Sequence, residues 1–427
     1  MVKRTERDFE QEVNIPKRAR TSKLRSAILS GGVQSLVQVN QRALIDKMLA
    51  RYAGDYSTFR ELIQNADDAG AQNISIEFLS STTSSEITNL TDIKVINNGR
   101  PFTNQDWERI SKIAEGNPDE QTVGMFGVGF YSVFSFTENP LIYSNNEWLA
   151  FHWQGDQLCT SRITQNEMIQ KDKKNFQNLH SYGANTAFLF SVRDKKLSFG
   201  LPELCKFFQT ALYFSKTLLN IKIIFNDKEI CDVTKKLLGR SRSIASDNDC
   251  SWLPDKNISA LLPSLRPEDR VNFRERLGIK IKNIKIIPME LQTSIKYKNQ
   301  NDKICENFIV VESGCIPVAT EEFDQQCHRI LKKKIPKITR CSLLFQSKEN
   351  SLQIGKIFVG ISTHQRTGCH VHLSGHFYPT IERENIDFQD AYLGHWNSLL
   401  LFVLGKISRK FYDHCMSDQK SFLKFFL

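Results

Sequence analysis

No stretch of this sequence approaches the roughly 18 unbroken apolar residues that a membrane-spanning helix requires, so we expect no membrane partner. The N-terminus has no apolar signal-peptide core. The ten cysteines include no Cys-x-x-Cys pair and no regular spacing, which is typical of a reducing compartment where most thiols are simply packed. We therefore expect an intracellular protein, in the cytoplasm or the nucleus.

Glycine and proline occur at ordinary levels, so most of the chain should fold. The 427 residues are 40% hydrophobic, which is ample for a large core and long for one domain, so we expect two domains. The formal net charge of +10 could attract polyanions or acidic partners. Because the sequence shows neither interleaved aromatic residues nor a known binding fold, it does not indicate specific nucleic-acid recognition.

Residues 1–26 are polar and charged, and we expect a disordered basic tail. Residues 16–20 read Pro-Lys-Arg-Ala-Arg and are followed by Lys23 and Arg25, a pattern that resembles a nuclear-localisation or nucleic-acid patch. The alternative is a solvated tail that keeps the protein soluble. We favour the solvated tail, because short basic runs are common.

The functional hypothesis rests on residues 60–70, which read Arg-Glu-Leu-Ile-Gln-Asn-Ala-Asp-Asp-Ala-Gly. The apolar residues recur at spacings of three and four, which predicts an amphipathic helix. Glu61, Asn65 and Asp68 lie at i, i+4 and i+7, so they share a polar face. Magnesium prefers oxygen ligands such as the Asn65 amide, and Glu61 could take a proton from a water that attacks a phosphate. A solvated helix face would give the same pattern.

Two later segments favour the chemical interpretation. Residues 95–99, Val-Ile-Asn-Asn-Gly, read as a strand that runs into a turn. Residues 124–132, Gly-Met-Phe-Gly-Val-Gly-Phe-Tyr-Ser, form a glycine-dense loop whose backbone N–H groups can approach a phosphate closely. One such loop is a weak signal, but the three segments together predict a nucleotide site.

These segments resemble the three nucleotide-binding boxes of the GHKL ATPases, which include gyrase, the ninety-kilodalton heat-shock chaperones, histidine kinases and MutL. The run Arg-Glu-Leu-Ile-Gln-Asn-Ala-Asp-Asp-Ala, with Phe-Thr-x-x-Asp-Trp after the turn, is most similar to the sacsin-type branch. The resemblance covers roughly residues 35–195 and, more weakly, 355–390. It implies ATP and Mg²⁺ as ligands and a chaperone-like activity.

The resemblance also implies roles for individual residues. Glu61 would be the general base, and Asn65 would bind magnesium beside Asp68. Most relatives begin the second box with an Asp that accepts a hydrogen bond from adenine, whereas Asn97 would accept it without charge. Pro101 stands where a glycine is expected and stiffens the turn. The other nucleotide contacts would come from Gly99, Gly124, Phe126, Gly127, Val128, Gly129, Phe130 and Thr186.

Three of these implied roles have alternatives. Thr186 matches a threonine that lies near the adenine ring, but Asn185 replaces the usual glycine, and an ordinary strand residue would fit as well. Residues 115–121 could close over the ligand as a lid or be a plain surface connection. Arg383 resembles a cation that reaches the γ-phosphate from a second domain, although an ion pair with a neighbouring glutamate would explain it equally.

Two clusters near the C-terminus carry weaker signals. Cys369, His370, His372 and His376 could suggest zinc, but apolar residues alternate with them as in a strand, so we favour a strand and loop. Cys327 and His328 are sequence neighbours, which seldom face each other productively as a nucleophile and base. Neither cluster enters the functional hypothesis.

The sequence predicts an α+β protein. Residues 27–230 would be a GHKL-type ATP-binding domain with the Bergerat-type sandwich of a mixed, largely antiparallel sheet and a helical layer on one face. Residues 231–270 would be a linker region, and residues 271–427 a second α/β domain with a C-terminal helix. We expect helices at residues 38–52, 58–69, 107–114, 202–219 and 392–425, and strands at 74–78, 93–96, 141–144, 149–153, 187–192, 221–225, 284–291, 307–311, 342–345 and 356–361.

Three function classes compete. The first is an ATP-hydrolysing, chaperone-like machine with nucleotide-linked lid and domain closure, acting on client or partner proteins. The second is a non-hydrolysing nucleotide-binding interaction module, which Asn97 and Pro101 favour. The third, a histidine kinase, is disfavoured because those kinases lack a general base at the Glu61 position and no phospho-acceptor helix is apparent. The sequence specifies neither the client nor the oligomeric state.

Overall fold

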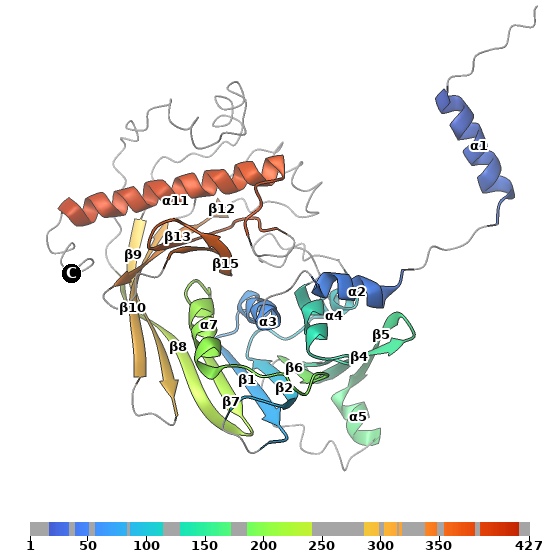
Figure 1. Cartoon of the computed structure of the whole chain (residues 1–427), viewed down its shortest axis with the longest axis horizontal. Helices are drawn as coiled ribbons and strands as arrows, with labels where there is room; N and C mark the ends of the chain where they lie inside the picture. The colour runs from blue at the N-terminus through green and yellow to red at the C-terminus, as the bar shows by residue number, and fades with distance from the viewer. Residues whose placement is uncertain are drawn as a thin grey trace, which may run out of the picture. The chain divides into compact units, whose positions relative to one another are not determined.

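The computed structural model describes twelve segments of the chain. These are residues 17–33, 39–50, 56–82, 86–113, 129–171, 186–240, 286–298, 303–313, 316–317, 338–347, 354–380 and 385–417. The chain divides into two compact units, Met1–Gln41 and Arg42–Leu427. Figure 1 labels most of the helices and strands.

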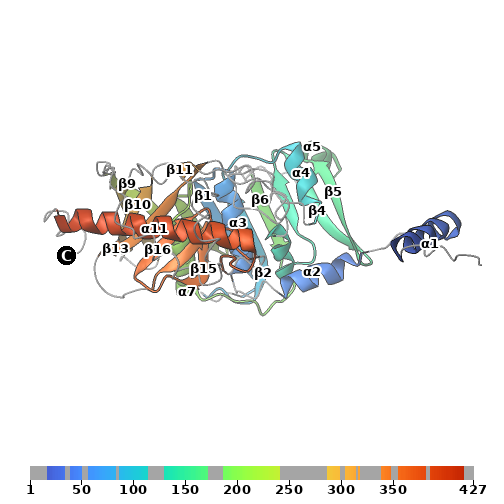
Figure 2. The ribbon, with the colours of Figure 1, turned by 90° about the horizontal axis from the view of Figure 1, so that it is seen from above.

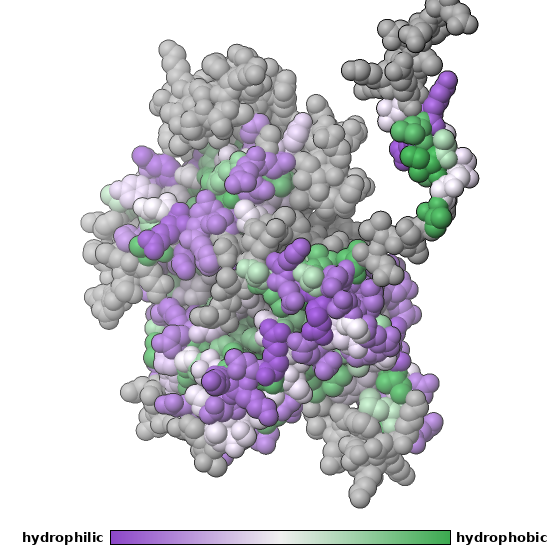
Figure 3. Space-filling model, turned by 45° about the vertical axis from the view of Figure 1, so that its right-hand side comes forward, coloured by the Kyte–Doolittle hydropathy of each residue, from purple (hydrophilic) through white to green (hydrophobic). Residues whose placement is uncertain are grey.

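The first unit contains helix α1 (Lys17–Gly31). Its Ala, Leu, Lys and Arg residues have favourable helix propensities, which explains why a segment that is too polar to build a core still forms a helix. The prediction of a disordered tail is therefore corrected to a helix for residues 17–26, and residues 1–16 lie outside the described part. Leu24, Ile28 and Leu29 are exposed on α1, and Figure 3 shows hydrophobic residues at its surface.

The second unit is built on one large mixed sheet. Within the described residues the strand order is β15-β14-β16-β13-β10-β9-β8-β7-β1-β2-β6-β3-β4-β5, and a separate pair joins β11 to β12. Most neighbours are antiparallel, whereas β1 with β7 and β14 with β16 are parallel. The expected α+β class with a mixed, largely antiparallel sheet is therefore confirmed.

Strands that follow one another in the chain pair antiparallel in β3–β4–β5, in β7–β8–β9–β10 and in β14–β15, whereas β16 lies between β14 and β13. Their bounds are β1 (Asn73–Ser80), β2 (Leu90–Asn97), β3 (Leu141–Ser144), β4 (Glu147–Gln154), β5 (Gln157–Thr164), β6 (Thr186–Ser191), β7 (Asn220–Phe225), β8 (Lys228–Arg240), β9 (Ile286–Tyr297), β10 (Lys303–Ser313), β11 (Ile316–Pro317), β12 (Ile338–Thr339), β13 (Cys341–Ser347), β14 (Lys356–Val359), β15 (Ile361–Arg366) and β16 (Val371–Gly375).

The expected linker at residues 231–270 begins inside a strand. Residues 231–240 belong to β8, and they pair antiparallel with β9 from Cys231 opposite Tyr297 to Arg240 opposite Met289. Cys231 and Val233 are buried, which explains why this polar-looking segment is held in the sheet. The sheet thus continues from the first predicted domain into the second, and residues 241–270 lie outside the described part.

Among the described residues, the helices that follow α1 are α2 (Gln41–Leu49), α3 (Ser57–Asp68), α4 (Asn104–Ile110), η1 (Gly129–Ser135, a 3₁₀ helix), α5 (Gln165–Lys171), α7 (Leu201–Leu212) and α11 (Ala391–Ser417). Helix α4 starts three residues earlier than predicted, because Thr103 and Asp106 form a capping box. Helix α7 ends well before residue 219. The backbone N–H groups of residues 216–218 donate to Asp67 instead of continuing the helix.

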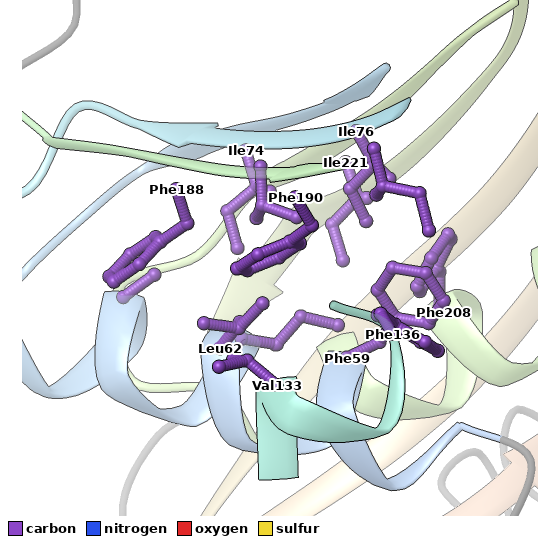
Figure 4. Close-up of a cluster of buried hydrophobic side chains, with 14 of the residues drawn as sticks. Phe59, Leu62, Ile74, Ile76, Val133, Phe136, Phe188, Phe190, Phe208 and Ile221 are labelled. Carbon is purple, nitrogen blue, oxygen red and sulfur yellow. The ribbon is translucent and has the colours of Figure 1, made fainter. Parts of the chain in front are cut away.

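The main hydrophobic core lies between the helices α3, α7 and η1 and one face of the sheet. Figure 4 shows Leu62 and Val133 on one side and Ile74 and Phe190 on the other. Phe59 is completely buried at the centre, with the rings of Phe78, Phe136, Phe199 and Phe208 between 5.4 and 5.9 Å away. This packing fixes α3 firmly on the sheet.

A second core lies beneath α11, which crosses the C-terminal strands in Figures 1 and 2. Trp396, Val403 and Phe411 of α11 are buried against side chains of β13 and β14 such as Leu343 and Ile357. The two halves of the sheet also share packing, because Ile361 at the start of β15 belongs to the main core that contains α3.

Candidate functional site

Helix α3 carries the three polar residues that the sequence singled out. The predicted helix is confirmed, and its apolar stripe is buried in the main core. Glu61 is only 2% exposed, whereas Asn65 is exposed and Asp68 is partly buried. A purely solvated face would not bury a carboxylate, so the environment of Glu61 differs from that of an ordinary amphipathic helix.

Gly129 lies directly against Glu61. A β-carbon at position 129 would overlap the Glu61 carboxylate, so any larger residue would have to displace this side chain. The last glycine of the glycine-dense loop is therefore brought beside the candidate base. Phe130, the next residue, is half-buried, and its ring lies 5.4 Å from that of Phe151, so its side chain packs in the core.

Thr58, one turn before the candidate base, ties α3 to η1. Its hydroxyl donates to the carbonyl oxygen of Ser132 at 3.0 Å and lies 3.0 Å from the Ser135 hydroxyl. From the sequence, Thr58 or Ser57 was expected to cap the helix, but the helix follows Tyr56 and has no side-chain cap. Here the hydroxyl instead fixes the segment that follows the glycine-dense loop.

The turn after β2 lies against the C-terminal end of α3. Asn97 is 5% exposed, and its Oδ1 accepts a hydrogen bond from the Gly99 N–H at 3.0 Å. A β-carbon at Gly99 would lie 3.0 Å from the β-carbon of Ala69, which is a very tight contact. The Arg100 N–H donates to the Ala69 carbonyl oxygen at 2.8 Å. These contacts explain why glycine is needed at position 99.

The ends of three neighbouring strands bring polar side chains together. Thr186, the first residue of β6, pairs with Asn97 of β2 on one side and with Ser144 of β3 on the other. The hydroxyls of Thr186 and Ser144 lie 2.9 Å apart, and Ser144 accepts a hydrogen bond from the Phe102 N–H. Ser144 was missed by the sequence analysis, because a serine at a strand end carries no motif.

Asp67 was also missed, although its carboxylate accepts several hydrogen bonds. Its carboxylate accepts from the backbone N–H groups of Lys216, Thr217 and Leu218 at 2.8 to 3.1 Å and from the Thr217 hydroxyl. Its neighbour Asp68 has a longer ion pair, at 3.9 Å, with the Lys216 ammonium. Sequence position alone cannot tell which of two adjacent aspartates faces the protein.

A partly buried lysine contacts this turn. The Lys235 ammonium of β8 donates to the Ser215 carbonyl oxygen and hydroxyl, each at 2.6 Å. Burial lowers the pKa of Lys235 to about 8, although the carboxylates of Asp67 and Glu312 act in the opposite direction. The turn that binds Asp67 is therefore held from both sides.

The C-terminal half of the sheet reaches α3 through one glycine. Gly360 lies in the turn between β14 and β15 with φ +73°, and a β-carbon there would overlap the Gln64 carboxamide. Gln64 is buried, and its Nε2 lies 3.5 Å from Asp68 Oδ1. The structure thus places part of the second predicted domain beside the polar face of α3.

Several predicted features lie outside the described residues. These are Gly124, Phe126, Gly127, Val128, Arg383, Cys327, His328 and the lid segment at residues 115–121. In the histidine cluster, His372 is buried, and its Nδ1 accepts a hydrogen bond from the Lys356 N–H at 3.0 Å. Burial lowers the pKa of His372 to about 4, so it is a neutral core residue. No helix in the described segments is long and apolar enough to cross a bilayer.

Parts of this chain are similar to known protein families, to one characterised protein and to a solved structure. The Sacsin domain matches residues 39–200, and a second family, described as a protein of unknown function, matches residues 349–424. Human sacsin is 33% identical over 109 residues, which is 23% of this chain and 2% of sacsin. A solved structure titled as the N-terminal domain of a DNA repair protein covers 84% of this chain and 94% of its own at 12% identity, with a TM-score of 0.34.

The matched segment contains α3, the turn after β2, and the paired ends of β3 and β6. It is thus the segment in which Glu61, Asn97 and Thr186 were identified from sequence. The chain spans only a small part of the length of human sacsin. The chain is therefore related to sacsin through the segment that carries the candidate site.

Proposed function

We propose that this chain is an ATP-binding and ATP-hydrolysing protein of the GHKL superfamily, with a Bergerat-type fold, that acts as a sacsin-type chaperone. The observation that carries the proposal is the contact between Gly129 and the buried carboxylate of Glu61, with Asn65 exposed on the same helix face. A buried carboxylate beside a glycine-dense loop is the arrangement that a water-activating base needs.

The proposed site divides its roles among separate elements. Glu61 would accept the proton of the attacking water, and Asn65 would bind the magnesium ion through its amide oxygen. Magnesium, when bound, neutralises charge on the phosphates. The loop from Gly124 to Gly129 would bind the phosphates through backbone N–H groups. Asn97 and Thr186, at the paired ends of β2 and β6, would contact the adenine.

The glycines of the site allow close contacts between the segments that would form it. Gly129 leaves space for Glu61, and Gly99 allows the turn after β2 to contact α3. Neither glycine has a positive φ among the described backbone angles, so close approach and not backbone conformation accounts for them. Larger residues there would separate the segments that the proposal requires to act together.

Nucleotide-linked closure is the second part of the proposal. The contact of Gly360 with Gln64 joins the C-terminal strands to α3, so a change at the polar face of α3 has a direct route to β14 and β15. Arg383 follows these strands in the chain and would reach the γ-phosphate, and residues 115–121 would act as the lid. Client or partner proteins would respond to this closure.

The test is a comparison of binding with turnover. Calorimetry with ATP and Mg²⁺ measures whether the nucleotide binds, and phosphate release measures whether it is hydrolysed. The proposal requires both, and it requires Glu61→Ala to lose phosphate release while it retains binding. A chain that binds no nucleotide would refute the proposed ligand, whatever its fold.

A non-hydrolysing nucleotide-binding interaction module is the second candidate. Asn97 favours it, because its Oδ1 already accepts the Gly99 N–H and carries no charge with which to strengthen a bond to adenine. This alternative predicts that the wild-type protein binds ATP and releases phosphate no faster than Glu61→Ala.

A further inference from the structure

Two cysteines from different elements meet in the main core. Cys205 lies on α7 and Cys231 on β8, and both side chains are completely buried. Their sulfur atoms are 3.1 Å apart. A disulfide bond is about 2 Å long, so the two sulfurs need to approach by only about 1 Å to form one.

The surroundings of the pair favour ionisation of one thiol. The hydrogen bond with Cys231 lowers the pKa of the Cys205 thiol and the hydrogen bond with Tyr297 lowers it further, while burial acts in the opposite direction. The Cys205 contact and burial both raise the pKa of Cys231. Tyr297 is the cross-strand partner of Cys231, so the sheet itself positions its phenol. Cys205 is therefore the more nucleophilic of the two sulfurs.

Other cysteines in the described segments differ from this pair. Cys341 is buried, and burial raises the pKa of its thiol to about 12. Cys305 and Cys369 are exposed. Among the described cysteines, Cys205 and Cys231 are the pair whose sulfur–sulfur contact is short enough for a bond. The alternative is that the two thiols are simply packed together in the core. That alternative does not account for the hydrogen bond between Tyr297 and Cys205.

We propose that Cys205 and Cys231 form a reversible disulfide that joins α7 to β8. The thiolate of Cys205 attacks one oxygen of hydrogen peroxide, the O–O bond breaks, and Cys205 becomes a sulfenic acid as the other oxygen leaves as water after protonation. The Cys231 sulfur then attacks the Cys205 sulfur, the S–O bond breaks, and a second water leaves. The two sulfurs together lose two electrons and two protons, and peroxide is reduced to two waters.

The bond would act on the contacts between α7 and the sheet. Further along α7, Lys206 forms an ion pair with Glu306 of β10 at 2.7 Å, and Gln209 donates to Thr293 of β9 at 3.0 Å. Residues 205 and 231 are 26 positions apart, so the bond closes a loop of that length and restricts the unfolded chain. Oxidation should therefore raise the melting temperature of the unit and keep α7 fixed on β8.

The experiment uses the full chain, reduced and then treated with hydrogen peroxide under native conditions. After removal of the peroxide, the protein is unfolded in the presence of N-ethylmaleimide, digested and analysed by mass spectrometry. We expect a linked peptide pair that joins Cys205 to Cys231, lighter by about 2 Da than the two thiol peptides, which dithiothreitol abolishes. Oxidation should be slower than at exposed Cys305, because buried thiols react through local opening.

Variants and melting curves give the controls. Cys231→Ala should lose both the linked peptides and the rise in melting temperature after peroxide, whereas Cys341→Ala, which removes a buried thiol elsewhere, should keep both. The wild-type peptide map does not depend on how either variant folds. The proposal is overturned if Cys205 and Cys231 both remain alkylated after a native peroxide exposure prolonged well beyond the time that oxidises Cys305 completely. It is equally overturned if the link forms only in denaturant.

Discussion

The carboxylate of Glu61 occupies the space that a β-carbon at residue 129 would need. This relationship joins α3 to the segment that follows the glycine-dense loop, two parts of the sequence that are far apart in the chain. Because Glu61 is 2% exposed, its side chain has little room to move aside. The position of the carboxylate therefore depends on the absence of a side chain at residue 129.

Gly129→Ala should displace Glu61 and impair hydrolysis more than nucleotide binding. A general base must lie within hydrogen-bond distance of the attacking water, so a small displacement should reduce phosphate release by about 10-fold or more. Phosphate release and calorimetric ATP affinity measure the two effects. Gly405→Ala is the matched control, because an added β-carbon there meets open space. Equal turnover in the two variants would contradict the proposed role of this contact.

Glu61→Ala and Asn65→Ala should fail in different ways. Removing the base leaves the contacts to nucleotide in place, so Glu61→Ala should still bind ATP while hydrolysis falls by roughly 10²–10⁴-fold. Removing a magnesium ligand should instead weaken binding of the metal–nucleotide complex in Asn65→Ala. Calorimetry in the presence of Mg²⁺ separates these outcomes. If Glu61→Ala weakened ATP binding and Asn65→Ala did not, the roles of base and magnesium ligand assigned to these two residues would be wrong.

Asp67→Ala should destabilise the protein more than Asp68→Ala. Asp67 accepts three backbone N–H groups and a hydroxyl, and its loss leaves buried donors unpaired, at a cost of about 2–4 kcal/mol. Asp68 is the adjacent carboxylate, with a longer ion pair, and serves as the control. Urea unfolding of both variants measures the difference. Equal free energies of unfolding would show that the turn at residues 216–218 does not need Asp67.

Lys235 predicts a pH dependence of stability. Its pKa is about 8 in the folded protein against an ordinary lysine value of 10.5, so the unfolded state binds more protons between these values. Stability should therefore rise as the pH increases from about 8 to 10.5, because folding in this range requires Lys235 to lose a proton, and the cost of losing it falls as the pH approaches 10.5. Lys235→Met should remove this rise, and Lys236→Met, at an exposed neighbouring position, should retain it. Urea midpoints across this pH range test the prediction.

The local elements could be predicted from the sequence because their signals are local. The apolar stripe of α3 and the alternation in β1 depend only on residues within each element, and both lie where the periodicity placed them. Helix α7 was predicted too long because its end is set by Asp67, which lies about 150 positions away in the chain. A distant hydrogen-bond acceptor leaves no periodic signal.

The site could be predicted only in part for the same reason. Glu61, Asn97 and Gly99 belong to motifs. The structure places Glu61 against Gly129, and it places Gly99, which is hydrogen-bonded to Asn97, against the end of α3. Ser144 and Thr58 act through single hydroxyl contacts to distant segments. The pairing of β8 with β9 was also missed, because residues 231–240 are largely polar and resemble a linker in composition, and only the pairing distinguishes them.

The contact between Gln64 and Gly360 provides the last prediction, which concerns coupling between α3 and the C-terminal strands. Gly360→Ala should destabilise the protein by about 1–3 kcal/mol, because it combines a positive φ with an overlap with the buried Gln64 carboxamide. Gly368→Ala is a close control, since Gly368 has φ +76° but its β-carbon would meet open space. The difference between the two variants therefore isolates the contact with α3.

A double-mutant cycle completes this test. Gln64→Ala removes the side chain that the new methyl group would meet, so it should recover part of the stability lost in Gly360→Ala while leaving Gly368→Ala unchanged. Free energies of unfolding for the single and double variants measure the coupling. Strict additivity of Gln64→Ala with Gly360→Ala would mean that the β14–β15 turn does not press on α3. The proposed route from the α3 polar face to the C-terminal strands would then have no physical basis at this contact.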